Sequence, residues 1–312
     1  MDHAQRPDAY DGWHGVLVST LALRRLPAWR DLLTLTKPGI LLGNLIAVLG
    51  GYGLAAIHHP DTEGHLLSLL VGSGMIIAAA GVFNNLLDQD MDRLMTRTQE
   101  RCQVLTRISV LQGFIWGILL LTVGSICLIS KVNVLTLSLA WGGLFVYLVP
   151  YTLHFKRRSW TGLWVGALAG ATPPLMGYCA LIPHLDHQAI WLFVCVCLWQ
   201  IPHAHAIALR HLEDYRRANL ALLPITHGTT LIRQRMPWYI GAFTLIACLP
   251  IFWDNNTQNG IITGALGIFW ELAAWRWRTI SSTRQWATRH FQCSLGIILL
   301  FNLSLIAPLI PW

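Results

Sequence analysis

The feature that most constrains this sequence is a series of long apolar segments that contain almost no charge. A helix that crosses a bilayer needs roughly 20 mostly apolar residues. None of these segments alternates with the period of two that marks a membrane β-barrel. The sequence therefore predicts an all-α, polytopic membrane protein with about nine transmembrane helices. The nine segments are residues 38–57, 66–87, 108–130, 132–151, 160–181, 189–209, 237–253, 260–275 and 291–311.

The composition excludes an ordinary soluble domain. Only 12% of the 312 residues are charged, whereas a soluble globular chain has about 25%. The seven cysteines include no C-x-x-C pair, and most lie within apolar segments. That arrangement argues against a disulfide framework and against a zinc site. We expect the cysteines to be small buried apolar side chains.

The basic residues fall almost entirely on alternate connections between the apolar segments. If the N-terminus lies on the cytoplasmic side, the inner connections hold 21 of the 22 Lys and Arg residues. This distribution follows the positive-inside rule. Contact with an anionic lipid leaflet also accounts for the net charge of +7, so nucleic acid is not expected as a partner. The inner segments are 1–37, 88–107, 154–159, 210–236 and 276–290.

Residues 1–35 are expected to form a cytoplasmic extension, followed by a transmembrane domain over 36–312. Within the extension, residues 15–23 resemble the apolar core of a signal peptide. However, Arg24 and Arg25 stand where a cleavage site needs small residues. We therefore expect this segment to be retained, as a tail or as a helix at the membrane surface.

The richest polar segment, residues 84–101, follows the second apolar run and contains neither Gly nor Pro. If the helix continues through it, Asn84, Asp88 and Asp92 share one face. A second stripe with the same spacing consists of Arg93, Arg97 and Arg101. In each stripe, like charges four residues apart repel one another, which costs a few tenths of a kcal/mol per pair unless something binds between them.

A divalent cation on the acids and a polyanion on the arginines would remove both repulsions. Mg²⁺ takes one or two carboxylates together with the phosphate oxygens of a substrate. The alternative is a solvated helix of mixed charge, which would be the better interpretation in a soluble protein. In a chain with so little charge, at the edge of a membrane, we favour a magnesium-bridged phosphate site on Asp88 and Asp92.

A second polar segment follows the sixth apolar run. Pro202 frees a backbone carbonyl within that run and allows a kink at a cavity. His203 is expected near the membrane interior, where an ionisable group is a functional candidate. A neutral histidine that is hydrogen-bonded within the bundle explains it about as well. Glu213 and Asp214 are expected at the membrane depth of Asp88 and offer a second carboxylate site.

The third element is the basic triplet Lys156-Arg157-Arg158 between the fourth and fifth runs. By itself it is consistent with a positive-inside anchor. If it faces a diphosphate, it donates charge-assisted hydrogen bonds as the leaving group gains charge. The pair Pro173-Pro174 interrupts the fifth run and leaves room for a cavity to form.

These segments resemble the intramembrane prenyltransferases of the UbiA superfamily, and within it the protoheme IX farnesyltransferase (haem O synthase) family. The superfamily motif N-x3-D-x3-D matches Asn84, Asp88 and Asp92. The pattern D-x-D-x-D-R-x-M-x-R-T-x-x-R of the narrower family matches residues 88–101. Further similar stretches are Thr36-Lys37-Pro38, L-W-Q-I-P-H at 198–203 and D-Y at 214–215, and the resemblance covers about residues 30–310.

The resemblance implies a magnesium-dependent enzyme of the inner membrane whose active site faces the cytoplasm. Such an enzyme transfers the farnesyl group of farnesyl diphosphate to the vinyl group of haem B, with water, and gives haem O for haem-copper oxidases. Haem A synthase is an implied partner. Asp88 and Asp92 are implied to hold Mg²⁺ and, with Asp214, to be catalytic. The implied diphosphate ligands are Asn84, Arg97, Arg101, Lys156 and Arg157, and His203 is the candidate for contact with haem.

Two departures from the family pattern, at Cys102 and Ala221, replace prolines and leave the charges intact. His203 stands where other superfamily members often have an aspartate, which argues against two symmetric metal sites. Two other functions stay open. A quinone-pathway prenyltransferase with an aromatic acceptor would share the aspartate motif. A haem or cation transporter would use membrane acids such as Glu271 as an ion path, with its ligands near the midplane.

Overall fold

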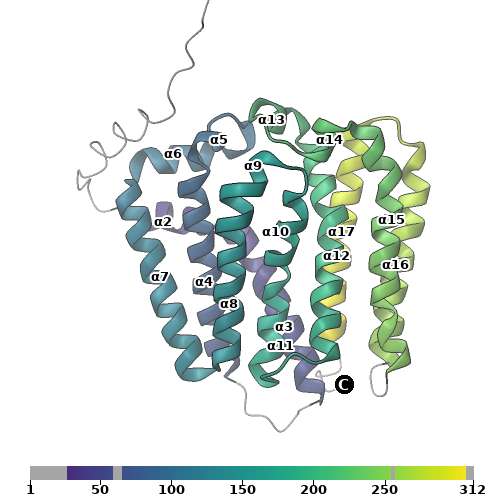
Figure 1. Ribbon diagram of the computed structural model, residues 1–312, viewed down its shortest axis with the longest axis horizontal. Helices are drawn as coiled ribbons and strands as arrows, with labels where there is room; N and C mark the ends of the chain where they lie inside the picture. The colour runs from purple at the N-terminus through teal and green to yellow at the C-terminus, as the bar shows by residue number, and fades with distance from the viewer. Residues whose placement is uncertain (1–26, 59–64, 254–256, 307–312) are drawn as a thin grey trace, which may run out of the picture.

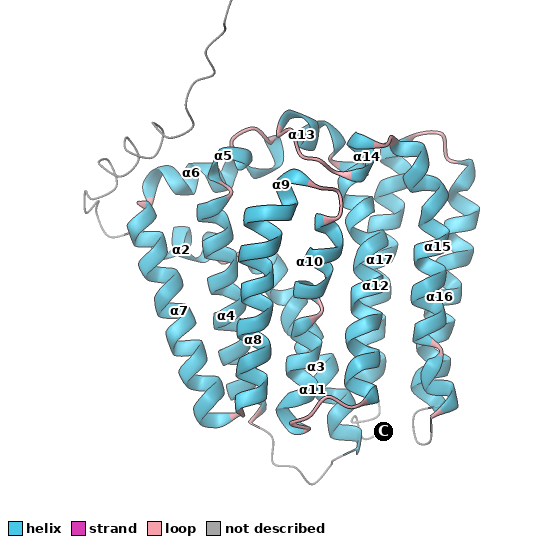
Figure 2. Cartoon of the chain, viewed as in Figure 1, coloured by secondary structure: helices cyan, strands magenta, loops and turns pink. Residues whose placement is uncertain are grey.

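The computed structural model describes residues 27–58, 65–253 and 257–306. Within these ranges the regular elements are helical and no strand occurs, so the all-α prediction is confirmed. Long helices stand side by side in one bundle, and short helices cover one of its ends (Figure 1, Figure 2). The long helices are α3 (Pro38–His58), α4 (Leu66–Leu87), α7 (Val110–Lys131), α8 (Val134–Val146), α10 (Gly162–Gly170), α11 (Thr172–Leu181), α12 (His187–Arg210), α15 (Thr229–Ala247), α16 (Thr257–Arg276) and α17 (Thr283–Ile306). The helices at the covered end are α5 (Gln89–Asp92), α6 (Gln99–Arg107), α9 (Lys156–Arg158), α13 (Leu212–Arg217) and α14 (Leu223–Thr226), and α2 (Trp29–Leu35) precedes the bundle.

Within the described residues, seven helical segments are long and apolar enough to cross a membrane. The other two expected segments are helical as well but are not among the seven: α16 occupies the eighth, and α10 with α11 occupies the fifth. A polytopic membrane protein is therefore the architecture, while a count of nine spans stays a prediction. The seven segments are Pro38–Ile57, Leu66–Leu87, Val110–Lys131, Val134–Arg158, His187–Arg210, Thr229–Phe252 and Thr283–Ile306.

The fifth expected segment is broken in its middle. Ala171, with φ −93° and ψ −4°, separates α10 from α11. Pro173 and Pro174 lie in the first turn of α11, where a missing N–H removes no helical hydrogen bond. Gln200 of α12 donates from Nε2 to the carbonyl of Ala167, 3.1 Å away, beside this break. The proline pair therefore interrupts the helix as its sequence predicts.

The expected cytoplasmic extension is only partly described. Residues 15–23 lie outside the described residues, so the surface helix proposed there stays a prediction. The end of the extension forms α2, which packs against α4, α6 and α7. Arg107 of α6 donates from Nε to Asp31 Oδ2 of α2 at 2.9 Å. This part of the extension is therefore held against the bundle, and the domain boundary at residue 35 stays a prediction.

The segments that contain most of the basic residues gather at one end of the bundle. The helices α5, α6, α9, α13 and α14 all lie at the upper end in Figure 1. Their connections are those that the charge pattern assigns to the inner side. Lys131, the single exception, is the last residue of α7 and lies at the opposite end. All seven cysteines are free thiols.

Glycines allow α3 and α11 to approach until their backbones touch. A Cβ atom on Gly51 would lie 1.8 Å from the carbonyl oxygen of Pro174, and one on Gly177 would lie 1.9 Å from the carbonyl oxygen of Val48. Small residues at helix crossings provide close packing where lipid supplies no hydrophobic driving force between helices. This crossing joins the helix that begins at Pro38 to the broken fifth segment, and both line the cavity described below.

We expect Gly177→Ala to lower the stability of the purified protein in detergent. The added methyl group must displace backbone, and overpacking of this kind costs roughly 1–3 kcal/mol. Gly241→Ala in α15 is the matched control, because nothing lies within 4 Å of its added methyl group. Thermal unfolding followed by tryptophan fluorescence should show a lower midpoint for Gly177→Ala alone. Equal midpoints for the two variants would contradict the close crossing.

Candidate active site

A cavity of about 760 Å³ lies among the helices and reaches the covered end of the bundle. Its size is in the range of small-molecule sites. Its wall is mainly apolar and is built from α3, α8, α10, α12 and α17, with residues such as Ile40, Leu144, Ile207 and Leu295. Such a wall suits a hydrocarbon group and excludes water.

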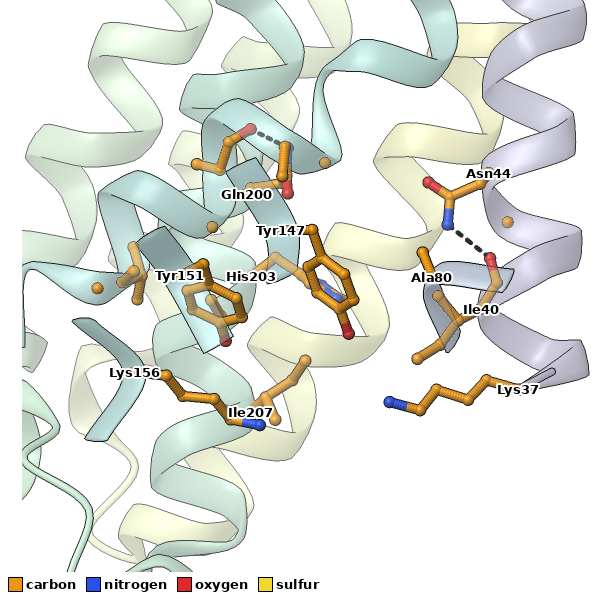
Figure 3. Close-up of a pocket in the computed structure, with 18 of the residues that line it drawn as sticks. Lys37, Ile40, Asn44, Ala80, Tyr147, Tyr151, Lys156, Gln200, His203 and Ile207 are labelled. Carbon is orange, nitrogen blue, oxygen red and sulfur yellow. Dashed lines mark hydrogen bonds between the residues drawn. The ribbon is translucent and has the colours of Figure 1, made fainter. Parts of the chain in front are cut away.

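Polar side chains enter this cavity from facing walls. Figure 3 shows Lys37 and Lys156 directed toward one another, with the hydroxyl groups of Tyr147 and Tyr151 turned to the same region. The two tyrosine rings are stacked with their centroids 5.8 Å apart. A cavity that is cationic in one region and apolar elsewhere matches an amphiphile with an anionic headgroup.

The polar segment 84–101 is not one continuous helix, so the expectation of two unbroken charged stripes was wrong. Helices α4 and α5 are separated by a single residue, and Met95 is extended, with φ −109° and ψ 127°. The reason is competition for backbone donors. The N–H groups of Thr96 and Arg97 donate to the carboxylate of Asp214, at 3.1 and 3.3 Å, rather than to helical carbonyls. Arg97 and Arg101 therefore have different partners, which are the hydroxyl of Tyr215 and the carboxylate of Asp92.

The acids of the first motif nevertheless stay together. Asn84 donates from Nδ2 to Asp88 Oδ2 at 2.8 Å. The backbone N–H of Asp92 donates to the carbonyl of Asp88 at 2.8 Å, so the short helix α5 keeps the second acid near the first. Asp88 and Asp92 are only 1% and 3% exposed. Two carboxylates buried this deeply require partners.

Each buried acid has a cationic partner. Lys156 forms an ion pair with Asp88, and Arg157 Nη2 lies 3.7 Å from Asp88 Oδ1. Arg101 Nη1 lies 3.3 Å from Asp92 Oδ2. Within the described part of the chain, Asp88 Oδ1 accepts no hydrogen bond. This oxygen is a buried acceptor that a further cation can satisfy.

A π-helical segment, Tyr147–Phe155, connects the acids to the cavity. Its Thr152 accepts a hydrogen bond from Asn84 Nδ2 at 3.0 Å and donates to the carbonyl of Tyr147 at 2.8 Å. The segment continues into α9, which begins with Lys156. Lys156 lines the cavity, whereas its ion-pair partner Asp88 does not line it and lies behind Lys156. Such helical irregularities are frequent at functional sites.

Lys37 is a site residue to which the sequence assigned no role. Its backbone is left-handed, with φ 55°, a conformation that is strained for a residue with a side chain. Its amino group donates to Asn84 Oδ1 and lines the cavity. Burial, followed by the charges of Arg101 and Lys156, lowers the pKa of Lys37 to about 7. The T-K-P stretch before the first apolar run was the available signal.

Two of the expected diphosphate ligands, Arg157 and Arg97, differ in their access to the cavity. Arg157 donates from Nη1 and Nη2 to the exposed Asp90, at 2.6 and 2.8 Å, and does not line the cavity. Arg97 lines the cavity, and its Nη2 donates to the hydroxyl of Tyr215 at 3.2 Å. Arg97 is therefore placed at the mouth, whereas Arg157 is placed at the surface behind the acids.

Asp214, the expected second-site acid, anchors the bent segment. Besides the two backbone donors described above, Arg217 Nη2 lies 3.0 Å from its Oδ1. Burial raises the pKa of Asp214, but the hydrogen bonds from Thr96 and Arg97 and the charge of Arg217 outweigh it, so the net pKa is lowered. Both carboxylate oxygens are thus engaged in holding the loop. Glu213 is exposed and pairs with Arg216 instead.

His203 faces the cavity from α12 between two aromatic rings. Its ring stacks on Trp199 and Phe291, with centroid distances of 4.6 and 5.3 Å. Its Nδ1 lies 2.7 Å from Ser294 Oγ. This environment combines both interpretations of the residue, because the ring is hydrogen-bonded within the bundle and still lines the cavity. Glu271, the acid that suits a transporter, does not line it and accepts from Trp275 Nε1.

A bundle of apolar helices with buried acids and cations beside an apolar cavity defines a membrane-embedded enzyme for anionic, lipid-like substrates. Residues 44–299 match the model of the UbiA prenyltransferase family. The chain belongs to this family of membrane prenyltransferases, as the aspartate motif predicts.

Curated relatives extend along nearly the whole chain. A protoheme IX farnesyltransferase of Protochlamydia amoebophila is 40% identical over 274 residues, which cover 88% of this chain and 96% of that protein. Protoheme IX farnesyltransferase 1 of Vibrio campbellii is 36% identical over 280 residues, covering 89% and 97%. These similarities support the narrower family that the motifs indicated.

Solved structures share the fold at low sequence identity. A digeranylgeranylglyceryl phosphate synthase superposes with a TM-score of 0.68 at 15% identity, covering 89% of this chain and 97% of that one. A UbiA homologue from Archaeoglobus fulgidus bound to GPP and Mg²⁺ gives 0.67 at 17% identity, covering 89% and 99%. The bundle described above is therefore the UbiA fold.

We expect Asp214→Asn to loosen the bent segment. An amide offers one acceptor where the carboxylate offers two, and loss of a hydrogen bond to a charged group costs about 1.5–3 kcal/mol. Trypsin should then cleave the purified protein after Arg97 roughly 10-fold faster or more, as measured by mass spectrometry. Glu213→Gln, which changes only an exposed acid, should leave the rate unchanged.

The hydrogen bonds that Asp214 accepts make the stability of the bent segment depend on pH. The pKa of Asp214 is lowered in the folded protein. Its contribution to stability is therefore fully present at pH values above its pKa in the unfolded chain, about 3.9. The contribution is lost as the pH falls through the lower, folded pKa. Protection of the Arg97 backbone amide, followed by hydrogen exchange, should therefore persist at neutral pH and decline only in strong acid. Equal cleavage of wild type and Asp214→Asn at pH 7 would contradict the anchoring role.

Proposed function

We propose that this chain transfers the farnesyl group of farnesyl diphosphate to a vinyl group of haem B, with addition of water, and releases haem O and diphosphate. One observation carries the proposal: buried acids and their cationic partners lie beside the polar region of a large apolar cavity. Relatives that are 34–40% identical and are named protoheme IX farnesyltransferases support the choice of substrates. The reaction class follows from membership of the prenyltransferase family.

The acids at the cavity fit a magnesium ion. Asp88 Oδ1 is a buried oxygen that accepts no hydrogen bond in the described structure. Mg²⁺ needs only one or two carboxylates when phosphate oxygens and water complete its shell, and the described residues contain no larger cluster of His, Cys, Asp or Glu. When bound by Asp88 and Asp92, it would neutralise charge on the diphosphate. The Mg²⁺ in the Archaeoglobus fulgidus structure supports this choice of ion.

The cations of the site would bind the diphosphate. Lys156 lines the cavity and pairs with Asp88, so it can transfer its hydrogen bond to a phosphate oxygen when the acid gains another partner. Lys37 approaches from the facing wall. Arg97 and Arg101 add positive charge at the mouth and beside Asp92. Together these groups stabilise the negative charge that develops on the leaving group.

The bond changes require a dry cavity. The allylic C–O bond breaks and both of its electrons leave with the diphosphate. The farnesyl cation then forms a carbon–carbon bond with the terminal carbon of the vinyl group. Water adds to the cation that remains beside the porphyrin and loses a proton, which leaves a hydroxyl group. The apolar wall, with Ile40, Leu144 and Ile207, keeps bulk water from quenching the first cation.

The proposal places the covered end of the bundle on the cytoplasmic side of an inner membrane. The positive-inside rule supports this orientation, because the connections at that end contain nearly all of the basic residues. In the same proposal, Asp214 positions the acid-bearing segment, and His203 contacts the haem. The product would pass to a haem-modifying enzyme, for which haem A synthase is the expected partner.

The two alternative functions make different use of the cavity. An aromatic acceptor would need the same acids and differs only in the group that is prenylated. A transporter would place its ionisable groups near the midplane, whereas Asp88, Asp92 and Lys156 lie at one end of the bundle. The arrangement therefore favours chemistry on a headgroup at that end.

We expect Asp88→Asn to reduce farnesylation of haem B by two or more orders of magnitude, because a neutral amide is a poor magnesium ligand. Asp90→Asn is the matched control from the same segment. Its carboxylate is exposed and pairs with Arg157, so we expect a change of only a few-fold. Haem products formed by purified protein with farnesyl diphosphate and Mg²⁺ are measured by mass spectrometry.

The same assay distinguishes the acceptors. Wild type is incubated with haem B and, separately, with an aromatic acid, and we expect a farnesylated product only from haem B. Farnesylation of the aromatic acid alone would assign the chain to the quinone-pathway branch. Near-normal turnover of Asp88→Asn would remove the metal assignment. Movement of haem across vesicles without any product would revive the transporter.

A further inference from the structure

The charged residues that line the cavity are of one sign. Among the residues that the structure describes, no Asp or Glu lines the cavity. The Lys and Arg residues that do so are Lys37, Arg97, Lys156 and Arg210. A cavity of this kind favours ligands that carry several negative charges. A diphosphate accounts for some of these cations but does not require all four.

Three of the four cations already have polar partners. Lys37 donates to Asn84, Lys156 pairs with Asp88, and Arg97 donates to a tyrosine hydroxyl. Arg210 differs, because no described residue forms an ion pair or a hydrogen bond with its side chain. Its guanidinium lies over the ring of Phe291, 4.9 Å from the centroid. Arg210 therefore lines the cavity with its hydrogen-bond donors available.

Arg210 lies on a different helix from the segment that carries Asp88 and Asp92. It is the last residue of α12, seven residues after His203. Seven residues correspond to nearly two turns and a rise of about 10.5 Å, so the two residues lie on the same face of the helix. Phe291 of α17 contacts both side chains. His203, Phe291 and Arg210 thus form a strip along the wall made by α12 and α17.

The proposed function assigns the diphosphate to the region between Lys37 and Lys156. Lys37 precedes α3, and Lys156 follows the π-helical segment, and these two residues adjoin Asn84 and Asp88. The strip on α12 and α17 is therefore available for the second substrate. Haem B presents a flat apolar ring that can lie against Phe291, and it has two propionate carboxylates. A guanidinium is the side chain that best matches a carboxylate.

We propose that Arg210 binds a propionate of the acceptor haem and so selects an acceptor with a carboxylate at its edge. This inference rests on the proposed function, because it takes haem B as the acceptor. Arg210 binds substrate and takes no part in breaking the diphosphate bond. The strip orients the ring, with its propionate edge at the mouth and its apolar body within the cavity.

The test compares haem B with its dimethyl ester, in which both propionates are masked. Binding to purified protein in detergent is measured by the change in haem absorption, without farnesyl diphosphate. We expect Arg210→Met to weaken haem B binding about 10-fold or more, and to leave binding of the ester unchanged. Arg210→Lys should restore most of the affinity, because it retains the charge.

The matched control is Arg276→Met. Arg276 is also the last residue of its helix, α16, but it does not line the cavity. The Arg276→Met protein should bind haem B and its dimethyl ester with the affinities of wild type. The KM for farnesyl diphosphate should be the same in wild type and in Arg210→Met, since the inference assigns Arg210 to the acceptor alone.

Three results would overturn the inference alone. They are equal weakening of haem B and its ester, no weakening of either, and a raised KM for farnesyl diphosphate with normal haem affinity. If wild type binds haem B but farnesylates only an aromatic acid, the inference and the proposed function both fail. Both also fail if wild type does not bind haem B. These outcomes are distinguished because the binding measurement requires no turnover.

Discussion

The structure of the site depends on the burial of negative charge at Asp88. A carboxylate that is 1% exposed in a low-dielectric environment is strongly destabilising unless a cation pairs with it. Lys156 provides that pairing, with Arg157 nearby. The same lysine lines the cavity. The group that stabilises the acid without substrate is thus the group that a phosphate would attract, so one exchange of partners links folding to binding.

Other parts of the fold keep this exchange in place. The π-helical segment brings Thr152 to Asn84 and carries Lys156 to the acid. The glycine crossing of α3 and α11 holds the helix that follows Lys37 against the broken fifth segment. Asp214 fixes the loop after α5 by accepting two backbone hydrogen bonds. A rigid frame of this kind allows charged groups to be aimed at a reacting bond in advance.

Much of this could be predicted from the sequence, because it depends on local patterns. Apolar runs of suitable length indicated the helices, and the four-residue spacing of Asn84 and Asp88 placed them together. The bend at Met95 could not be predicted, since it depends on Asp214, 118 residues from Thr96. The left-handed backbone of Lys37, by contrast, is a local feature, because this residue directly follows the C-cap of α2 and its N–H donates to the carbonyl of Thr34.

The central claim is that the buried acids bind the diphosphate through a divalent cation. The most direct measurement is the affinity of wild type for a slowly reacting thiolodiphosphate analogue of farnesyl diphosphate, by calorimetry, with Mg²⁺ and with EDTA. We predict that affinity falls at least 10-fold without Mg²⁺, and that the analogue raises Mg²⁺ affinity by the same factor, as linkage requires. Equal affinity in EDTA would contradict the account.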